Sequence, residues 1–107
     1  MGKIYRDVNH ITFYNVIHRE VEKAERKFPW WPDDPIHAAA IVVEEAGELQ
    51  QAALQFCYED GTLEKMEKEA LHTAAMAHRF LQNLCSYKKL PEAPEKGGKD
   101  EKETAGI

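Results

Sequence analysis

The sequence has little of what marks membrane-bound, secreted or nucleic-acid-binding proteins. No apolar run approaches the roughly 18 residues that a membrane span needs, and the longest run, residues 36–43, is interrupted by His37. The N-terminal MGKIYRDVNH has no apolar core of the kind found in secretory signals. We therefore expect a cytoplasmic protein that does not bind membranes, and a length of 107 residues predicts a single domain.

Cysteine and clustered basic residues are also scarce. Cys57 and Cys85 are 28 positions apart, which fits neither CxxC chemistry nor a disulfide framework, so we expect two reduced, buried thiols. The formal net charge is −5 and no basic stripe appears, which argues against a nucleic acid polymer as partner.

The acidic residues are concentrated in one part of the chain. Residues 43–69 hold eight acidic and two basic side chains, whereas the other 80 residues hold 11 acidic and 12 basic ones. The surplus of negative charge is therefore local, and any account of function should explain this segment.

Three long helical patterns, with no convincing strand, predict an all-α fold. They cover residues 5–28, 35–59 and about 62–87, with a proline-rich break, FPWWPDDP, after the first. Asp34 and Thr62 are the expected N-caps of the second and third helices. We divide the chain into a helical domain over residues 1–90 and a flexible polar tail over residues 91–107.

The second helical pattern is apolar over an unusually wide arc. Its apolar residues sweep about 200° of the helix, whereas an ordinary surface helix shows a stripe of about 100°. Such a helix must pack on two or more sides, yet one chain supplies only two partner helices. We therefore expect a bundle with three main helices per chain, completed by dimerisation into a larger bundle; a homodimer and a homotetramer are both compatible.

Carboxylates cluster on the second and third helical patterns. Glu44, Glu45 and Glu48 are three or four residues apart and so project from neighbouring helical positions. Glu69 and His72 could face them from the next helix, where packing should partly desolvate Glu69. These groups form either a solvated acidic face or a metal site between helices, since hard ions such as Mg²⁺ take oxygen ligands.

The stretch HAAAIVVEEAGELQQA and the later MEKEALHTAAMAHRFL resemble the MazG-like family of all-α nucleoside triphosphate pyrophosphohydrolases, above all its short, single-domain, phage- or mobile-element-like members. The family pattern is Glu-x-x-Glu on one helix and Glu-x-x-Asp on the next. Glu45 and Glu48 match the first pair, and Glu69 matches the first position of the second pair. The chain departs from the pattern at the last position, where His72 replaces Asp.

The resemblance implies metal-dependent hydrolysis of a (d)NTP to (d)NMP and pyrophosphate, an activity suited to nucleotide-pool housecleaning. It implies Glu45, Glu48 and Glu69 as ligands of Mg²⁺ or Mn²⁺, with Glu44 and Glu48 as catalytic carboxylates. We include His72 among the metal ligands, as a donor for a softer ion. It is otherwise a group outside the coordination shell, or a sign of reduced or lost activity.

Four further residues are candidates for contacts with the triphosphate substrate: Trp31, His37, Arg79 and Asn83. Arg79 could neutralise phosphate charge, and Asn83 could donate a hydrogen bond. Trp31 would stack on a base or, alternatively, fill a corner between helices, and His37 would contact base or phosphate or cap its helix. The alternative to an enzyme is a weak or inactive nucleotide- or metal-binding module, or a protein-interaction module.

Overall fold

The computed structural model describes residues 9–91, and this part of the chain is helical, without strands. Its elements are α1 (His10–Lys27), α2 (Pro35–Tyr58), α3 (Leu63–Gln82) and a short 3-10 turn, η2 (Leu84–Ser86). The prediction of an all-α chain with three main helices is confirmed. Residues 5–8 of the first predicted helix, and the predicted tail from residue 92 onward, lie outside the described residues.

Each helix begins at a side-chain cap. The side chains of Asn9, Asp34 and Thr62 accept hydrogen bonds from backbone N–H groups of the first turns of α1, α2 and α3. Pro35, which has no N–H to satisfy, occupies the first position of α2. The predicted caps Asp34 and Thr62 are therefore confirmed.

The third helix is shorter than the sequence pattern predicts, ending at Gln82 rather than near residue 87. The side-chain amide of Asn83 donates to the Arg79 carbonyl at 2.8 Å, taking the acceptor that the next helical N–H would use. The Asn83 N–H turns to the Phe80 carbonyl instead, and the tighter η2 turn follows. A side chain that competes with the backbone thus ends the helix.

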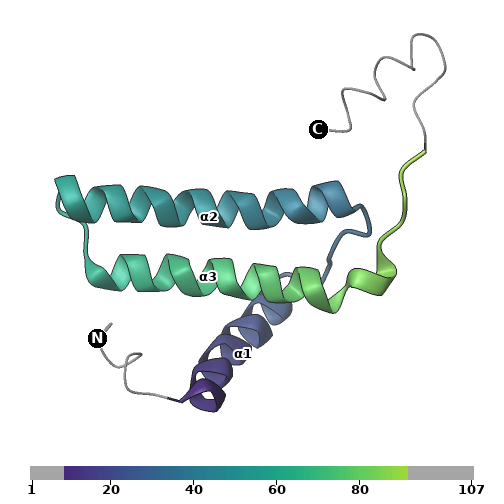
Figure 1. Cartoon of the computed structure of the whole chain (residues 1–107), viewed down its shortest axis with the longest axis horizontal. Coiled ribbons are helices and arrows are strands. Elements are labelled where there is room, and N and C mark those ends of the chain that lie inside the picture. The colour runs from purple at the N-terminus through teal and green to yellow at the C-terminus, as the bar shows by residue number, and fades with distance from the viewer. Residues whose placement is uncertain (1–8, 92–107) are drawn as a thin grey trace, which may run out of the picture.

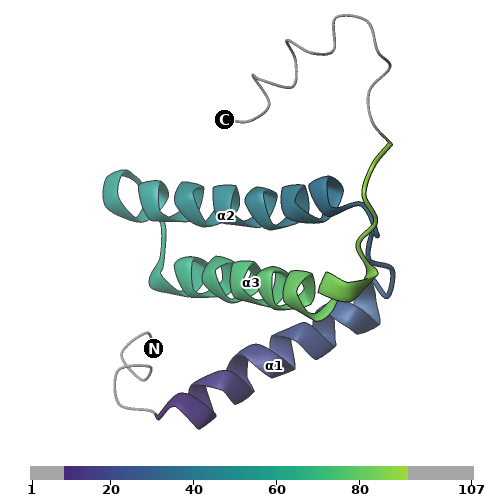
Figure 2. The ribbon, with the colours of Figure 1, turned by 45° about the vertical axis from the view of Figure 1, so that its right-hand side comes forward.

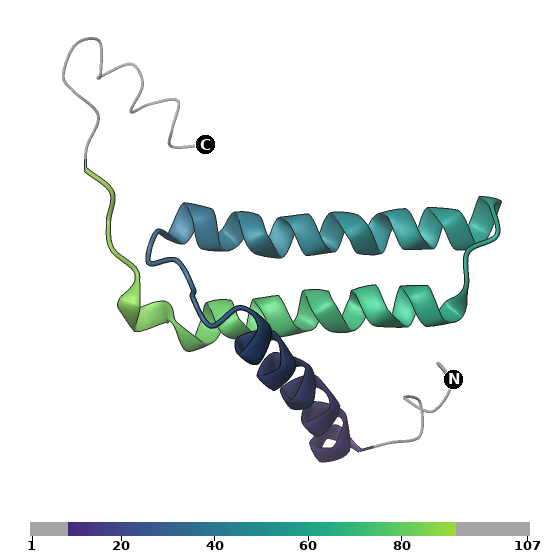
Figure 3. The same ribbon diagram turned by 180° about the vertical axis from the view of Figure 1, so that it is seen from behind.

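Helices α2 and α3 lie side by side and antiparallel (Figure 1). Seen from behind, α1 crosses α3 near the linker to α2 (Figure 3). Helix α3 therefore lies between the other two and packs against both (Figure 2). The turn between α2 and α3 needs glycine, because a Cβ on Gly61 would lie 2.6 Å from the backbone nitrogen of Phe56.

The apolar core of the described residues is small. Val21, Ala38, Ala52 and Ala75 are its buried apolar side chains, each no more than 1% exposed. Fourteen large apolar side chains are exposed: Ile11, Phe13, Tyr14, Phe28, Trp30, Ile36, Val43, Leu54, Phe56, Tyr58, Leu63, Leu81, Leu84 and Leu90. Many large apolar side chains are therefore left uncovered within the described part of the chain.

Helix α2 is apolar on two opposite faces. Ala38 and Ala52 are buried, and a spacing of seven residues places Glu45 between them on the face toward α3. Ile36, Val43 and Leu54 are exposed and lie about half a turn of the helix away from that face. The wide apolar arc of the sequence thus divides into a face that packs within the chain and a face that does not.

Both cysteines are free, as expected, but the prediction that they are buried is wrong. Cys57 lies in the last turn of α2 and Cys85 lies in η2, so both are at the ends of elements rather than over the core. Within residues 9–91, no helix combines the length and apolar character needed to cross a membrane.

Candidate metal centre

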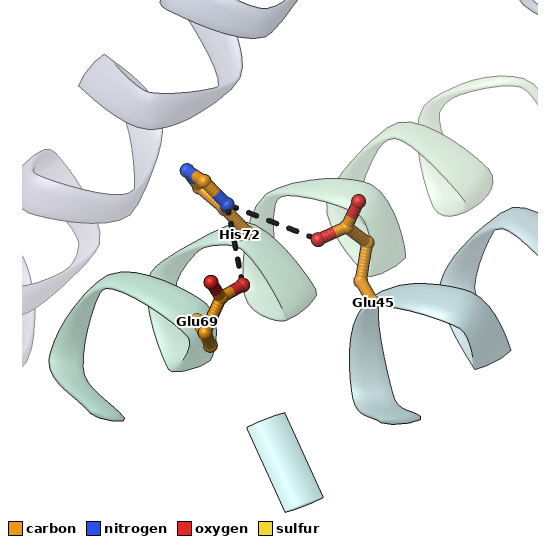
Figure 4. A group of neighbouring side chains, drawn as sticks. All are labelled: Glu45, Glu69 and His72. Carbon is orange, nitrogen blue, oxygen red and sulfur yellow. Dashed lines mark ion pairs between the residues drawn. The ribbon is translucent and has the colours of Figure 1, made fainter. Parts of the chain in front are cut away.

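Three potential ligands from two helices meet beside α1. Glu45 comes from α2, and Glu69 and His72 come from adjacent turns of α3 (Figure 4). One ligand atom from each lies within 4.8 Å of the other two. The expectation that packing desolvates Glu69 is confirmed, because this residue is only 3% exposed.

The two carboxylates converge on a single imidazole nitrogen. His72 Nδ1 lies 3.8 Å from Glu45 Oε1 and 3.6 Å from Glu69 Oε1, beyond the 2.7–3.2 Å range typical of hydrogen bonds. Both carboxylate oxygens are buried and have no hydrogen-bond partner among residues 9–91. Buried polar atoms are almost always satisfied, so this donor set fits a cation held between the three side chains.

Lys65 holds the second oxygen of Glu69. Its Nζ lies 3.1 Å from Glu69 Oε2, one helical turn away, and its own side chain is about half exposed. Burial raises the pKa of Glu69, but the hydrogen bond and charge of Lys65, helped by His72 and Lys68, outweigh it and leave this pKa below its ordinary value. Glu69 is therefore a carboxylate at neutral pH, with one oxygen directed at His72.

Glu45 is in the opposite electrostatic situation. Burial first, and then the neighbouring charge of Glu48, raises its pKa above the ordinary value; His72 opposes the rise, and Glu69 and Glu44 add to it. No lysine or arginine in the described part of the chain is among the groups that shift the pKa of this carboxyl. A cation at the centre would relieve the repulsion that Glu45 experiences.

Two of the three residues, Glu45 and His72, line one end of a cleft of about 550 Å³ formed by α1, α2, α3 and the linker between α1 and α2. Its other end is aromatic and cationic, with Trp30, Trp31 and Arg79. Arg79 is seven residues from His72 along α3, so the two ends are about 10 Å apart. The full lining is Glu20, Lys23, Ala24, Lys27, Phe28, Trp30, Trp31, Ile41, Glu45, Glu48, His72, Met76 and Arg79.

The aromatic end is closed by a chain of contacts around Arg79, which is only 4% exposed. Its Nη2 donates to the Phe28 carbonyl at 2.9 Å, and its guanidinium lies over the Trp31 ring at 4.9 Å. The Trp31 indole N–H donates to the Tyr87 hydroxyl, which in turn donates to the Phe80 carbonyl. These contacts fasten the linker and the segment after α3 to the end of the cleft.

The remaining predicted carboxylates, Glu48 and Glu44, are both exposed. Glu48 lines the cleft next to Glu45, although it is not part of the three-ligand group. Glu44 does not line the cleft, and its negative charge helps to raise the pKa of Glu45. Of these two predicted catalytic carboxylates, only Glu48 thus lines the cleft together with Glu45.

The predicted substrate contacts are divided in the same way. Trp31 and Arg79 line the cleft, whereas His37 and Asn83 do not. His37 is exposed, with its ring 5.7 Å from the ring of Trp30, and Asn83 caps the end of α3. Trp30, which is 67% exposed, presents more of its ring to solvent than the half-buried Trp31.

Sequence reasoning missed several residues around the site. Lys65 could have been found from its i,i+4 spacing to Glu69, a geometry that pairs opposite charges on helices. Lys23 and Lys27 of α1 line the cleft only because α1 crosses α3, and no local pattern encodes that crossing.

No protein-family model, curated protein or solved structure matches this chain. The Glu–Glu–His group could hold a metal ion, and the cleft beside it joins acidic, aromatic and basic side chains from all three helices. The function of the protein therefore rests on this geometry and on the carboxylate motifs of the two helices.

Proposed function

We propose that the protein is a metal-dependent nucleoside triphosphate pyrophosphohydrolase, which converts a (d)NTP to (d)NMP and pyrophosphate in the cytoplasm. The observation that carries the proposal is the pair of buried, unpartnered oxygens of Glu45 and Glu69, which face His72 at one end of a cleft with tryptophans at the other. The resemblance of the two helical motifs to the MazG-like family supports the same activity.

In this proposal Glu45, Glu69 and His72 hold a divalent ion. Such an ion, when bound, supplies charge neutralisation for the triphosphate and a lowered pKa for the attacking water. Glu48 lines the cleft beside Glu45, is exposed, and is therefore the carboxylate that accepts the proton of that water. The water oxygen bonds to the α-phosphorus, the bond from that phosphorus to the α–β bridging oxygen breaks, and pyrophosphate leaves with that oxygen.

The cleft also gives the substrate a direction. Phosphates belong at the end with Glu45 and His72. Lys23 and Lys27 of α1 also line the cleft, where Lys23 pairs with Glu20 at 3.2 Å and Lys27 lies over the Phe28 ring. The base belongs at the other end, where the exposed ring of Trp30 offers a stacking surface. Arg79 already contacts Phe28 and Trp31, so in this proposal it shapes the base end and contributes its charge from there.

The test is release of pyrophosphate from a panel of standard and modified nucleoside triphosphates, with Mg²⁺ or Mn²⁺. Glu48→Gln should lower kcat by about 10²–10⁴, the usual contribution of a general base. Glu59→Gln is the matched control, because Glu59 is exposed at the end of α2 and does not line the cleft. A panel left unhydrolysed with both ions would exclude the enzyme.

A nucleotide- or metal-binding module without turnover is the second candidate, favoured by the replacement of the family Asp with His72. It keeps the cleft and the metal centre but not the reaction. Thermal stabilisation by a nucleoside triphosphate together with the absence of pyrophosphate release would distinguish it from the enzyme.

We also propose that a second copy of the chain completes the bundle. Ile36, Val43 and Leu54 leave an apolar stripe on the face of α2 turned away from α3. The exposed Gly47 is on the same helix, and a Cβ there would meet nothing within 4 Å. Since glycine inside a helix costs about 1 kcal/mol relative to alanine, close approach of a second helix would give Gly47 a reason that the chain itself does not.

An apolar groove adjoins this stripe. It has a volume of about 370 Å³ and is lined by Ala39, Val42, Val43, Ala77, Phe80 and Leu81. Val43→Glu should convert a dimer or tetramer into a monomer in analytical ultracentrifugation, whereas Leu90→Glu, an exposed position outside both stripe and groove, should not. A wild-type chain that sediments as a monomer would contradict the proposal.

A further inference from the structure

We propose that His72 sets the identity of the metal, so that the site binds a divalent first-row transition ion, such as Mn²⁺ or Zn²⁺, in preference to Mg²⁺. In this proposal the imidazole Nδ1 is a direct ligand, together with one oxygen of Glu45 and one of Glu69. The inference rests on the metal-binding part of the proposed function, but not on turnover.

The orientation of the imidazole is the first observation. Nδ1 is directed between the two carboxylates, and the other ring nitrogen is directed away from them (Figure 4). Ligand atoms that share one ion, with bonds of about 2.0–2.2 Å, lie about 3–4 Å apart. The separations of 3.6 and 3.8 Å from Nδ1 to the two Oε1 atoms fall in this range.

The burial of Glu69 is the second, independent observation. An acidic cluster on a solvated surface would leave each oxygen to water, but Glu69 is 3% exposed and its Oε1 has no hydrogen-bond partner. Because Lys65 holds Oε2 at 3.1 Å, only Oε1 is directed toward His72. Glu69 therefore offers a single oxygen to an ion, in a fixed direction.

The donor set decides which ion this is. Mg²⁺ favours an octahedral shell of oxygen ligands and dehydrates reluctantly. Imidazole nitrogen suits zinc, copper, iron and nickel, and affinity along the first-row series rises from Mn²⁺ toward Zn²⁺ and Cu²⁺. A third carboxylate in place of His72 would add another anionic oxygen and favour Mg²⁺, whereas a neutral nitrogen beside two carboxylates favours the transition ions.

An ion-free alternative is an imidazolium that pairs with both carboxylates. Hydrogen bonds between charged nitrogen and oxygen are usually about 2.7–2.9 Å long, so at 3.6 and 3.8 Å the ring of His72 makes neither bond well. The space between the three groups is better used by an ion that contacts all of them.

The experiment measures metal binding directly, without nucleotide. Metal-free protein is titrated calorimetrically with Mg²⁺, Mn²⁺ and Zn²⁺, and the Mn²⁺ complex is examined by pulsed electron paramagnetic resonance for modulation from a directly bound ¹⁴N. We expect Mn²⁺ to bind at least about tenfold more tightly than Mg²⁺, Zn²⁺ to bind more tightly still, and the nitrogen modulation to be present.

His72→Asp is the decisive variant. It should lower the ratio of Mn²⁺ to Mg²⁺ affinity at least about tenfold and abolish the nitrogen modulation. His10→Asn, at the exposed first residue of α1, should change neither and controls for other histidines. Circular dichroism verifies that His72→Asp folds, and the pulsed spectrum of the wild type tests the ligand without any variant.

Four results would overturn the inference: equal affinity for Mg²⁺ and Mn²⁺, an unchanged ratio in His72→Asp, a wild-type spectrum without nitrogen modulation, or no binding of any ion. The last would also remove the metal-dependent part of the proposed function. Selective binding of Mn²⁺ without pyrophosphate release would sustain this inference while contradicting the enzyme. Pyrophosphate release together with equal affinity for Mg²⁺ and Mn²⁺ would sustain the enzyme while contradicting this inference.

Discussion

Helix α3 buries two charged side chains, Glu69 and Arg79, and their surroundings differ in one respect. Arg79 donates to the Phe28 carbonyl and lies over the Trp31 ring, so its charge is used within the chain. Glu69 has Lys65 at one oxygen, but its other oxygen has no hydrogen-bond partner. The difference teaches that the buried charge of Arg79 fastens the fold, whereas the buried charge of Glu69 leaves one oxygen that could bind an ion.

Burying a charge is costly unless its partners are supplied. At the Arg79 end they come from the linker before α2. At the Glu69 end Lys65 compensates one oxygen, whereas the charge of Glu69 repels the neighbouring carboxylate of Glu45. If the comparison is right, removing Arg79 should harm stability, and removing Glu69 should mainly harm metal binding.

The largest effect is expected from Arg79→Ala. It leaves the Phe28 carbonyl without its donor and removes the cation over Trp31, so the free energy of unfolding should fall by about 2–4 kcal/mol. Arg19→Ala, an exposed arginine of α1, should stay within about 0.5 kcal/mol of the wild type. Urea denaturation measures both, and equal losses would mean that Arg79 is not an anchor.

Glu69→Gln should show the opposite behaviour. At Mn²⁺ concentrations about 100 times the dissociation constant, the wild type should gain about 2.7 kcal/mol of stability, and the variant should gain almost none. Without metal, the variant should be less stable by no more than about 1 kcal/mol, because it loses the ion pair with Lys65, whose side chain is about half exposed. Calorimetric melting with and without Mn²⁺ measures this stabilisation, and the control Glu59→Gln should gain as much from Mn²⁺ as the wild type.

Tyr87→Phe tests the outer contacts of the Arg79 end. The hydroxyl accepts from the Trp31 indole at 2.9 Å and donates to the Phe80 carbonyl at 3.0 Å, so its removal should cost about 1 kcal/mol. Tyr58→Phe, at a hydroxyl that is largely exposed at the end of α2, should leave the urea midpoint unchanged. A similar shift in both variants would show that the Tyr87 hydroxyl has no special role.

The smallest effect is expected in the pH dependence of stability that Glu45 causes in the metal-free protein. The pKa of Glu45 is raised, so this carboxylate destabilises the folded chain at neutral pH, and the penalty fades as the pH falls through the raised pKa to the ordinary 4.5. Glu45→Gln should therefore be slightly more stable than the wild type at pH 7 and lose that advantage at pH 4. Urea midpoints at both pH values measure it.

Glu69 changes the stability of the folded chain with pH in the opposite direction. Its pKa is lowered, so its contribution to stability is complete above the ordinary value of 4.5 and is lost as the pH falls through the lower folded pKa. Arg79 stays charged throughout, and the cost of Arg79→Ala should not change between pH 7 and pH 4. If the loss of stability caused by Arg79→Ala depended on pH, Arg79 and the carboxylates would not differ in the way proposed.

Sequence patterns predicted most of the fold because helices are started and stopped locally. Asp34, Pro35 and Thr62 determine where α2 and α3 begin, and all three can be read from the sequence. The end of α3 was missed because the Asn83 side chain takes a carbonyl of the helix, a competition that apolar periodicity does not report.

The site was only partly predictable for a different reason. Spacing alone brings Glu69 and His72 together, but which of the neighbouring carboxylates on α2 joins them depends on how that helix is rotated against α3. Ala38, Glu45 and Ala52 are seven residues apart, and the burial of the two alanines shows that this face is the one turned toward α3. The contribution of α1, such as Lys23, depends on a crossing between helices that are far apart in the sequence.

The two tryptophans of the chain give the cleft an optical readout. Trp30 is 67% exposed and should fluoresce at long wavelength with easy quenching by iodide, whereas Trp31 is half-buried, with the Arg79 guanidinium over its ring. A molecule seated at the aromatic end would shield the first indole and leave the second nearly unchanged. Occupancy of this end can thus be followed in solution from the chain's own emission, without a label.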